Sequence, residues 1–350
     1  MRGVDDVGAK YLGAALRKNK SLVKLTVSSE KIRDKGAAAV ADALKVNNTL
    51  QLLDMSNNNI ADAGAEEFAG ALRVNCALRC LKLDFNFIFA GAIPLFHSLR
   101  FNTCLRTFSL CGNFIGDAGI VLLSEALKVN TSLQFIYLKN THFGIYGAEY
   151  LSDALKVNSI LLELDVAKNR IGARGASSFA LALAENTTLT AFDLSSNNIQ
   201  NDGAVSIGDA LRDNKSLRTL FIADNKIGAH GAARLSYGLC SNTSLETLIL
   251  SCNIVDDVGA LALGDALRAN SSLKTLNLAQ TNIAENGARY LCSALRQNIC
   301  SRILDLRCNQ FDPLRLSDDF AKVRCDNRSA IVQIWHRDAD PYHYPSLSNY

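Results

Sequence analysis

One pattern of apolar positions recurs along this chain. From residue 50 onwards, apolar side chains first occupy alternating positions and then follow the spacing of one helix face, as in Leu50, Leu53, Met55, Phe68 and Leu72. The alternation predicts a short strand, and the later spacing predicts a helix. Each unit of the pattern is therefore expected to hold one strand followed by one helix.

The unit repeats at a nearly constant interval. Successive units begin 28 residues apart, except for one step of 27 residues between Leu78 and Leu105. A fixed period of this length is the signature of a solenoid. The eleven predicted strand-bearing repeats begin at Leu22, Leu50, Leu78, Leu105, Leu133, Leu161, Leu189, Leu217, Leu245, Leu273 and Ser301.

A short parallel strand cannot bury its inner side alone. The predicted strands must therefore stack into one parallel sheet, with the helices packed against it. Because helices are wider than strands, we expect the stack to bend into a horseshoe with the sheet on its concave face and the helices on its convex face. This predicts an α/β solenoid.

Two residue types recur at the turns of the unit. Asparagine follows the strand in most repeats, and its amide is suited to pair buried backbone groups in a ladder of stacked turns. Glu30, Thr141 and Thr281 replace it, so we expect looser packing there. Glycine recurs where the chain enters the helix, since a side chain would crowd the neighbouring repeat. The asparagines are Asn58, Asn86, Asn113, Asn169, Asn197, Asn225, Asn253 and Asn309.

The ends of the chain depart from the pattern. Residues 1–20 match only the second half of a unit, so they predict a partial first repeat or a cap, and the solenoid is expected to span 1–312. Residues 313–337 include the apolar run 330–335, which predicts a closing strand within a C-terminal cap. Residues 338–350 are predicted to form a flexible tail because they contain little aliphatic side chain.

Composition narrows the range of functions. The net charge of +3 gives no strong field for a polyanion or an anionic membrane. No apolar run is long enough to span a bilayer, and the first twenty residues lack the apolar stretch of a signal peptide. The ten cysteines have scattered spacings, which favours reduced thiols. We therefore expect a cytoplasmic protein that contacts neither nucleic acid nor membrane.

The consensus Leu-x-x-Leu-x-Leu-x-x-Asn-x-Ile-x-x-x-Gly-Ala-x-x-Leu-x-x-Ala-Leu-x-x-Asn resembles the ribonuclease-inhibitor-like leucine-rich repeats. Segments such as 43–47 and 86–92 look like the recognition domains of NOD-like receptors. The resemblance implies a non-catalytic scaffold or sensor that binds a protein, with no cofactor. It leaves two alternatives: a regulator of a Ran-like small GTPase, and a structural subunit of an assembly such as a cilium. No Gly-x-x-x-x-Gly-Lys-Ser/Thr phosphate loop occurs in the chain.

Catalytic and metal chemistry have little support in the pattern. The five histidines, at 97, 142, 230, 336 and 343, lie at no metal-ligand spacing and are interpreted as solvent-facing. A row of Lys and Arg follows the last helical leucine of most repeats. Acidic residues three positions earlier, as at Asp42, Glu125, Asp153, Asp209 and Asp265, predict ion pairs within the helices rather than an anion-binding surface.

The strand side chains that point away from the helices form the predicted binding site. Packing does not constrain them, so they are free to vary. Phe135, Tyr137 and Lys139 are expected beside an acidic patch of Glu163, Asp165 and Asp193, and Phe221 with Ile249 is expected to form a second apolar spot. The full set of predicted partner-binding residues is Lys82, Asp84, Phe135, Tyr137, Lys139, Glu163, Asp165, Asp193, Phe221 and Ile249.

Overall fold

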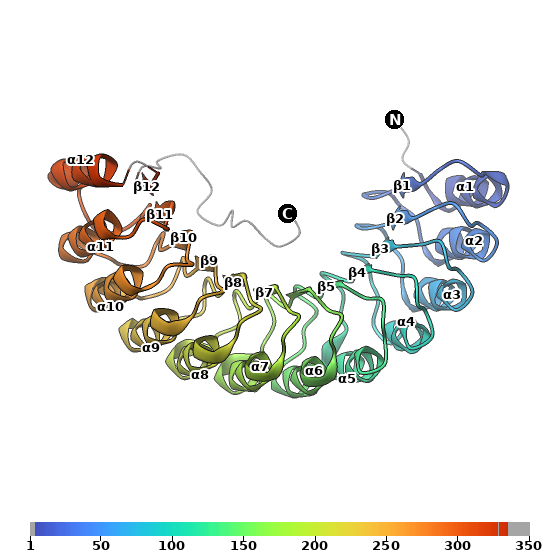
Figure 1. Ribbon diagram of the computed structural model, residues 1–350. Helices are drawn as coiled ribbons and strands as arrows, with labels where there is room; N and C mark the ends of the chain where they lie inside the picture. Colours follow the sequence, from blue (N-terminus) through green and yellow to red (C-terminus); the bar gives the residue numbers. More distant parts are fainter. Residues whose placement is uncertain (1–3, 328, 335–350) are drawn as a thin grey trace. The chain divides into compact units, whose positions relative to one another are not determined.

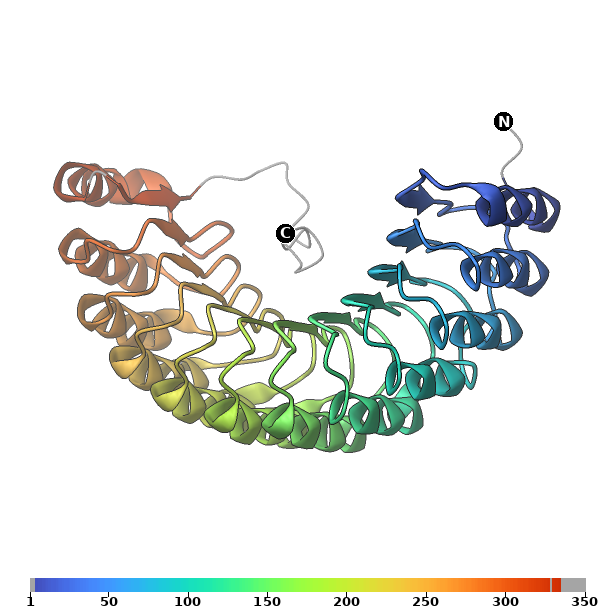
Figure 2. The same ribbon diagram turned by 45° about the vertical axis from the view of Figure 1, so that its right-hand side comes forward.

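The computed structural model describes residues 4–327 and 329–334 of the chain. These residues form alternating strands and helices that divide into two compact units, Met1–Asn169 and Arg170–Tyr350. In each unit the strands make one layer and the helices make the other (Figures 1 and 2). This is the predicted α/β solenoid.

Unit 1 contains the helices α1 (Asp6–Lys18), α2 (Asp34–Leu44), α3 (Asp62–Leu72), α4 (Ala92–Leu99), α5 (Gly116–Leu127) and α6 (Ile145–Val157). Its strands are β1 (Lys24–Thr26), β2 (Leu52–Asp54), β3 (Cys80–Lys82), β4 (Thr107–Ser109), β5 (Phe135–Tyr137) and β6 (Glu163–Asp165). Helix α4, in the repeat that is one residue short, has only 8 residues, against 11 in α3 and 12 in α5.

Unit 2 contains the helices α7 (Gly172–Glu185), α8 (Gln200–Asp213), α9 (Ala229–Ser241), α10 (Asp256–Ala269), α11 (Glu285–Gln297) and α12 (Ser317–Asp326). Its strands are β7 (Ala191–Asp193), β8 (Thr219–Phe221), β9 (Thr247–Ile249), β10 (Thr275–Asn277), β11 (Ile303–Asp305) and β12 (Ile331–Gln333), and a 3-10 turn, η1 (Pro313–Leu316), precedes α12.

Within each unit, neighbouring strands pair in parallel and in repeat register. Leu53 lies opposite Leu25 and Leu81, and Leu248 lies opposite Leu220 and Leu276. Strand β12 pairs with β11, so the apolar run at the C-terminus does supply the closing strand, and the described residues hold one strand more than the eleven repeats predicted. The predicted tail, residues 338–350, lies outside the described residues.

The core is built from the repeating aliphatic positions between the two layers. Leu50, Leu53, Met55, Ile60 and Phe68 of the second repeat and its helix are fully buried. The equivalent residues of the inner repeats are buried as well, whereas Leu22 of the first repeat is 37% exposed, so the apolar surface of a repeat is covered by its neighbours. None of the helices in the described part of the chain has both the length and the apolar character that crossing a membrane requires.

The predicted asparagine ladder is present. The Nδ2 group of Asn225 donates to the carbonyl oxygens of Leu194 and Ala223, each at 3.0 Å, and its Oδ1 accepts from the backbone N–H of Asn197 at 2.9 Å. One buried amide thus pairs backbone groups of its own repeat and of the repeat before. Asn58, Asn86, Asn113, Asn169, Asn253 and Asn309 make corresponding bonds.

The expected loosening at Thr141 and Thr281 does not occur. Both residues are fully buried. The hydroxyl of Thr141 donates to the Leu138 carbonyl at 2.7 Å, and that of Thr281 donates to the Leu278 carbonyl at 2.6 Å. The threonine hydroxyl therefore makes the hydrogen bond that the asparagine amide makes to its own repeat elsewhere, and the turn stays closely packed.

A second asparagine ladder runs along the helix C-termini. Asn75 donates to the carbonyl oxygens of Leu44 and Asn47, and its Oδ1 accepts from Ala77 and Leu78. Four of the asparagines in Asn-x-Ser/Thr sequons at this position are at most 5% exposed, so they are buried within the repeat: Asn130, Asn186, Asn242 and Asn270. Asn327 continues the ladder into the C-terminal cap by donating to Leu295 and Asn298.

Six of the twelve α-helices in the described residues are capped at their N-terminus by a side chain from the preceding repeat. The Oδ1 atom of Asp34 accepts from the backbone N–H groups of Ala61 and Gly64, at 2.7 and 3.0 Å, and so caps α3. A carboxylate at this place pairs free N–H groups and complements the helix dipole. The residues that cap α2, α4, α6, α9 and α11 in the same way are Asp6, Asp62, Asp117, Asn201 and Asp257.

The remaining repeat helices start differently, and the sequence of the preceding repeat explains why. The capping position there holds Phe89, Ile145, Ala173 or Ala229, none of which accepts a hydrogen bond through its side chain. The following helix then starts with a residue in the left-handed conformation, whose N–H donates at 2.9 to 3.0 Å to the carbonyl of a ladder residue in the next repeat. These residues are Gly116, Gly172, Gln200 and Asp256.

The repeat glycines are required by the closeness of these contacts. A Cβ atom on Gly64 would lie 2.8 Å from Asp34 Oδ1 and 3.0 Å from the Ala37 methyl group. Any side chain there would displace the capping carboxylate from the N–H groups of α3. The glycine at this position therefore allows both the cap of its own helix and the close approach of the preceding helix.

We predict that Asn225→Ala lowers the free energy of unfolding by about 1–3 kcal/mol, because buried backbone groups of two repeats lose their partner. Urea denaturation followed by circular dichroism measures this change. Asn48→Ala is the matched control, since Asn48 is exposed and its side chain has no recorded hydrogen bond. Equal stability of the two variants would contradict the structural role of the ladder.

We predict that Asp34→Ala lowers the free energy of unfolding by about 1 kcal/mol, because α3 loses its cap. The control is Asp213→Ala, which removes only an exposed ion pair with Arg212 and is expected to leave stability nearly unchanged. Denaturation midpoints that shift equally in both variants would show that the carboxylate of Asp34 does not act as a cap.

Candidate functional site

Two neighbouring strands of unit 1 bring three predicted site residues together. In the register of β5 and β6, Phe135 lies opposite Glu163 and Tyr137 lies opposite Asp165. Phe135, Tyr137 and Glu163 are all half-buried, so their rings and carboxylate are partly open to solvent on the sheet face, the side of the strands turned away from the helices. The predicted pairing of aromatic rings with an acidic group is therefore present on these strands.

A hydrogen bond links the two strands across this face. The Tyr137 hydroxyl donates to Glu163 Oε2 at 3.2 Å. Burial raises the pKa of Tyr137, and the neighbouring Glu163 raises it further. Burial also raises the pKa of Glu163, although the hydrogen bond from Tyr137 opposes this shift. At neutral pH the phenol thus stays a donor, and the carboxylate accepts from it.

The acidic patch expected beside these rings does not form an open surface. Asp165 and Asp193 are only 1% and 3% exposed. The Oδ1 of Asp165 accepts from the backbone N–H of Ala167 at 2.9 Å, and that of Asp193 accepts from Ser195 at 2.8 Å. Asp54, Asn277 and Asp305 make the same bond to the residue two places on. The side chain at this position therefore holds the end of the strand.

Asp84, which follows β3, pairs the backbone at the C-terminal end of β4. In that repeat Ser109 occupies the position that aspartate holds elsewhere. Asp84 Oδ1 instead accepts from the Ser109 hydroxyl and, at 2.8 Å, from the backbone N–H of Cys111. Burial raises the pKa of Asp84 above its usual value, although these two hydrogen bonds and Lys82 lower it in part. Lys82 and Lys139 are half-exposed.

The predicted apolar spot in unit 2 is wrong as an exposed surface. Phe221 is 2% exposed and Ile249 is 3% exposed. The two residues lie opposite each other in β8 and β9, and the register places Asp193 and Asn277 on their outer sides. Side chains in register on strands about 4.8 Å apart cover one another, so these two residues pack within the sheet face.

An aromatic cluster that the sequence reasoning missed lies on the strand-to-helix loops of unit 1. Here it is called the aromatic edge, and it consists of Phe85, Phe87, Phe89, Phe114 and His142. The four phenylalanines are 58%, 51%, 49% and 46% exposed. The ring of Phe114 stacks on Phe89, with centroids 4.9 Å apart, and on His142, with centroids 4.6 Å apart. His142 is therefore part of a ring stack and not the solvent-facing residue predicted.

Phe85 occupies a backbone position that disfavours an aromatic residue. Its φ is +51°, in the left-handed region, as at the equivalent position of the other repeats, where residues such as Asn57, Gly112 and Lys168 stand but no aromatic residue does. A Cβ atom on Gly112 would lie 2.4 Å from the Phe85 ring, so this glycine makes room for the ring. The signal in the sequence was the run of three phenylalanines at alternate positions, of which Phe85 and Phe87 stand where the preceding repeat has asparagine.

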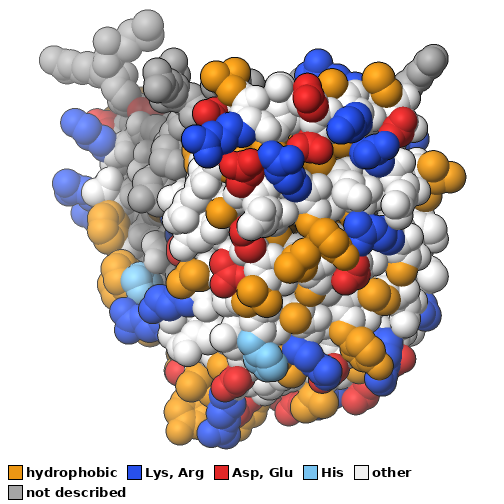
Figure 3. Space-filling view, turned by 90° about the vertical axis from the view of Figure 1, so that its left-hand side faces the viewer, with side chains coloured by type: hydrophobic (Ala, Val, Ile, Leu, Met, Phe, Trp, Pro, Cys, Tyr) orange, Lys and Arg blue, Asp and Glu red, His pale blue; other side chains and the backbone are white. Residues whose placement is uncertain are grey.

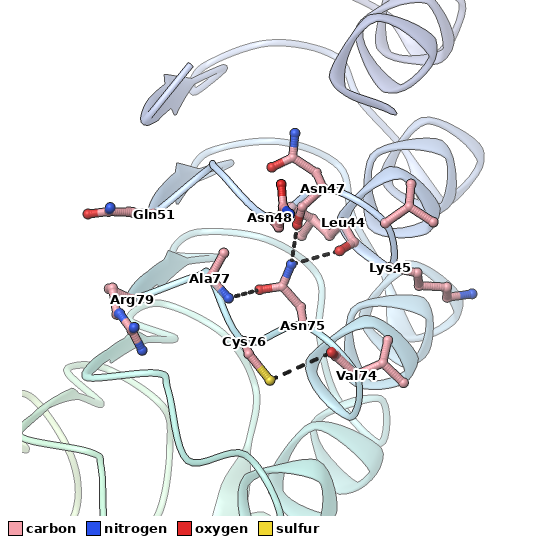
Figure 4. A pocket seen from close by; sticks show the side chains of 11 residues that line it. Leu44, Lys45, Asn47, Asn48, Gln51, Val74, Asn75, Cys76, Ala77 and Arg79 are labelled. Atoms are coloured by element: carbon pink, nitrogen blue, oxygen red, sulfur yellow. Dashed lines mark hydrogen bonds between the residues drawn. The ribbon is translucent and has the colours of Figure 1, made fainter. Parts of the chain in front are cut away.

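A cavity of about 390 Å³ lies on the helix-to-strand loops of the second and third repeats, away from the predicted site (Figure 4). Lys45, Gln51, Val74, Cys76 and Arg79 are among its lining residues. In Figure 4 the amide of Asn75 points to the carbonyls of Leu44 and Asn47. These polar groups of the cavity lining are therefore already hydrogen-bonded within the second asparagine ladder. Among the described residues, no group of three or more His, Cys, Asp or Glu side chains is arranged to hold a metal ion.

The basic row on the helices is largely neutralised, as predicted. Lys45, Lys128, Lys156 and Arg268 pair with the acid three residues earlier. Arg212 instead pairs with Asp213, and Asp209 pairs with Arg234 of the next repeat. Figure 3 shows basic and acidic side chains interspersed on the face in view, rather than gathered into one field.

Comparison with known proteins agrees with this architecture. A family model described as "Leucine Rich repeat" matches residues 46–69, 157–180, 185–208, 241–264 and 269–292. The chain contains leucine-rich repeats. Such repeats are typically non-catalytic protein-interaction modules. No curated protein matches the sequence.

Three solved structures are similar to the chain at low identity, and the first of them shows the same fold. An internalin (inlF) from Listeria monocytogenes is 18% identical, with a TM-score of 0.54 over 95% of both chains. The tropomodulin C-terminal domain of Caenorhabditis elegans is 16% identical over 42% of this chain and 91% of its own, with a TM-score of 0.38. Leiomodin-1 actin-binding site 2 is 24% identical over 36% of this chain and 76% of its own, with a TM-score of 0.35.

We predict that Asp84→Asn removes part of the pH dependence of stability. A carboxyl whose pKa is raised on folding stabilises the fold below its unfolded pKa, and this contribution is lost as pH rises through the folded pKa. Asparagine still offers Oδ1 to Ser109 and Cys111 but does not ionise. The free energy of unfolding of the variant, minus that of the wild type, should therefore increase as the pH rises from 4 to 7. Urea denaturation at both pH values checks this, and a constant difference between them would contradict it.

Proposed function

We propose that this chain is a non-catalytic scaffold or sensor module that binds another protein through unit 1. The partner contacts the half-exposed residues of the sheet face, Phe135, Tyr137 and Glu163, and extends onto the aromatic edge. The observation that carries the proposal is the aromatic edge itself, since its four phenylalanines are each about half-exposed and lie on neighbouring loops.

Exposed aromatic rings of this kind are characteristic of interface anchors. Most surface apolar residues occur singly, whereas contiguous patches mark sites of association. Aromatic side chains at such sites often contribute about 2 kcal/mol or more to binding. The stacked rings of Phe89, Phe114 and His142 restrict one another, so little side-chain freedom is lost when a partner covers them.

The left-handed backbone of Phe85 supports the same proposal. An aromatic residue in this conformation costs on the order of 1 kcal/mol relative to glycine or asparagine. The equivalent residues of the other repeats share this conformation, among them Lys168 and Gln280, but none of them is aromatic. A ring kept there, over a glycine that accommodates it, is consistent with selection for contact with a partner.

The chemistry of the face indicates the character of the partner. Glu163 and the Tyr137 hydroxyl provide polar groups beside the Phe135 ring. Lys139, just after β5, and Lys82, at the end of β3, are half-exposed. We expect a partner that inserts apolar side chains against the rings and donates hydrogen bonds to Glu163. Asp165 and Asp193 are not expected to contribute, because they are buried and hold strand ends.

The two alternatives named above have no specific observation in their favour. Neither the family match nor the structural neighbours support a role with a small GTPase, and none points to a cilium. A cytoplasmic location also remains our proposal. It is supported by the ten free cysteines, several of them exposed, which are typical of a reducing compartment.

We predict that the double variant Phe87→Ser, Phe114→Ser loses at least about thirtyfold in affinity for its partner, as expected for the loss of an anchor of about 2 kcal/mol. The wild type, this variant and Tyr11→Ser are compared in quantitative affinity capture, followed by titration of each purified candidate. Tyr11 is the matched control because it is 74% exposed and lies on α1.

The variants separate the proposal from its alternatives. A partner retained by Tyr11→Ser and lost by the double variant supports the aromatic edge. Phe135→Ala should weaken the same partner, whereas Phe221→Ala should lower stability without changing affinity, because Phe221 is buried in unit 2. Titrations in which every variant binds as tightly as the wild type would reject the proposed site.

A further inference from the structure

Two thiols on successive loops of unit 1 form a pair outside the proposed interface. Cys76 lies on the loop between α3 and β3, and Cys104 lies on the loop between α4 and β4. Cys76 is exposed and Cys104 is half-buried. The two cysteines lie on loops that stack on each other in neighbouring repeats, and the Cys76 thiol donates to the Val74 carbonyl at 3.8 Å.

One amide side chain holds the two loops against each other. Asn102 Nδ2 donates to the carbonyl of Asn75, next to Cys76, at 3.2 Å. Asn102 Oδ1 accepts from the backbone N–H of Cys104 at 2.9 Å. Arg79 adds a third connection, because its Nη1 donates to the Cys104 carbonyl at 2.9 Å. The pair is therefore fixed by buried ladder contacts rather than by chance proximity of long side chains.

We propose that Cys76 and Cys104 form a peroxide-sensitive site, in which Cys104 is the nucleophile, Cys76 resolves the product, and a disulfide joins the third and fourth repeats. The surroundings suit these roles. A cation beside a partly exposed thiol favours the thiolate, which is the reactive form. Arg79 lies beside Cys104, and Cys76 is open to solvent at the rim of the cavity shown in Figure 4.

The acidities of the two thiols agree with this assignment. Burial works against ionisation of Cys104, but hydrogen bonds from Arg79, Thr103 and Cys76 and the charge of Arg79 outweigh it, so its pKa lies below the usual value. The pKa of Cys76 is raised, chiefly by its hydrogen bond with Cys104 and the charge there. Cys104 is thus the first of the two to ionise.

The reaction needs a hydroperoxide as the oxidant and is balanced in two steps. The Cys104 thiolate attacks the outer oxygen of the hydroperoxide, the O–O bond breaks, and the leaving alkoxide takes a proton to become an alcohol. Cys104 is then a sulfenic acid. The Cys76 thiol attacks that sulfur, the S–S bond forms as the S–O bond breaks, and the departing hydroxide takes the thiol proton to become water.

The sequence around the pair makes the product easy to detect. Trypsin cleaves after Arg73, Arg79, Arg100 and Arg106, so each cysteine falls in a short peptide with no other cysteine, 74–79 and 101–106. The reduced full-length chain is treated with one equivalent of hydrogen peroxide, alkylated and digested without reductant. We expect the linked pair of peptides to be the main disulfide product.

Variants assign the two roles. Cys76→Ser should leave a sulfenic acid on Cys104 that dimedone labels, while Cys104→Ser should give neither label nor cross-link at these positions. Cys240→Ser, at an exposed cysteine on α9, is the control and should behave as the wild type does. Arg79→Gln should slow cross-linking severalfold, since the Cys104 thiolate loses the cation beside it. In this variant the linked peptide runs over 74–82.

Circular dichroism of each variant establishes that it is folded before oxidation. Cys76 is exposed, so its replacement by serine is not expected to disturb the core. Oxidation spread evenly over the ten cysteines, or no bond between peptides 74–79 and 101–106, overturns the proposal. Dimedone labelling of Cys76 rather than Cys104 would reverse the assigned roles and also contradict it.

Discussion

The structure depends on pairing buried backbone groups between one repeat and the next. Every turn that passes under the sheet or leaves a helix has N–H and C=O groups that water cannot reach, and an unpaired group of this kind costs about 1–3 kcal/mol. The two asparagine ladders meet this requirement, each amide bonding to its own repeat and to its neighbour, as Asn225 and Asn75 do. Repeat spacing, strand register and helix position all follow from these bonds.

The helix starts show that this constraint has more than one solution. Where the preceding repeat supplies an acceptor, as Asp34 does, its side chain caps the next helix. Where it supplies an apolar residue instead, the helix begins with a left-handed residue such as Gly116, which bonds to a ladder carbonyl. A substitution in one repeat thus decides the backbone conformation of the next, so neighbouring repeats are not independent units even though each is built on the same pattern.

Because many polar side chains pair backbone groups, fewer residues are available to bind a partner. Asp165 and Asp193 are acidic and lie on the face expected to bind, yet both are buried because they pair the backbone at the strand end. The rings of the aromatic edge and the half-exposed side chains on β5 and β6 do not hold a strand end in this way. The aromatic side chain of Phe85 and the thiols of Cys76 and Cys104 are likewise features that the ladders do not require.

The sequence by itself determined the strand-and-helix unit, its period, the asparagine ladder and the glycines, because these depend on contacts that recur at a fixed interval along the chain. Even the closing strand could be predicted from its apolar run. Only the tertiary structure decided which of these side chains are exposed to solvent. Phe221 and Ile249 alternate as surface residues do but are covered by neighbours in register, while Phe89, Phe114 and His142, from three different loops, meet as one stack. Periodicity fixes which face a side chain is on, but its contact with water depends on the size of the residues 28 positions away.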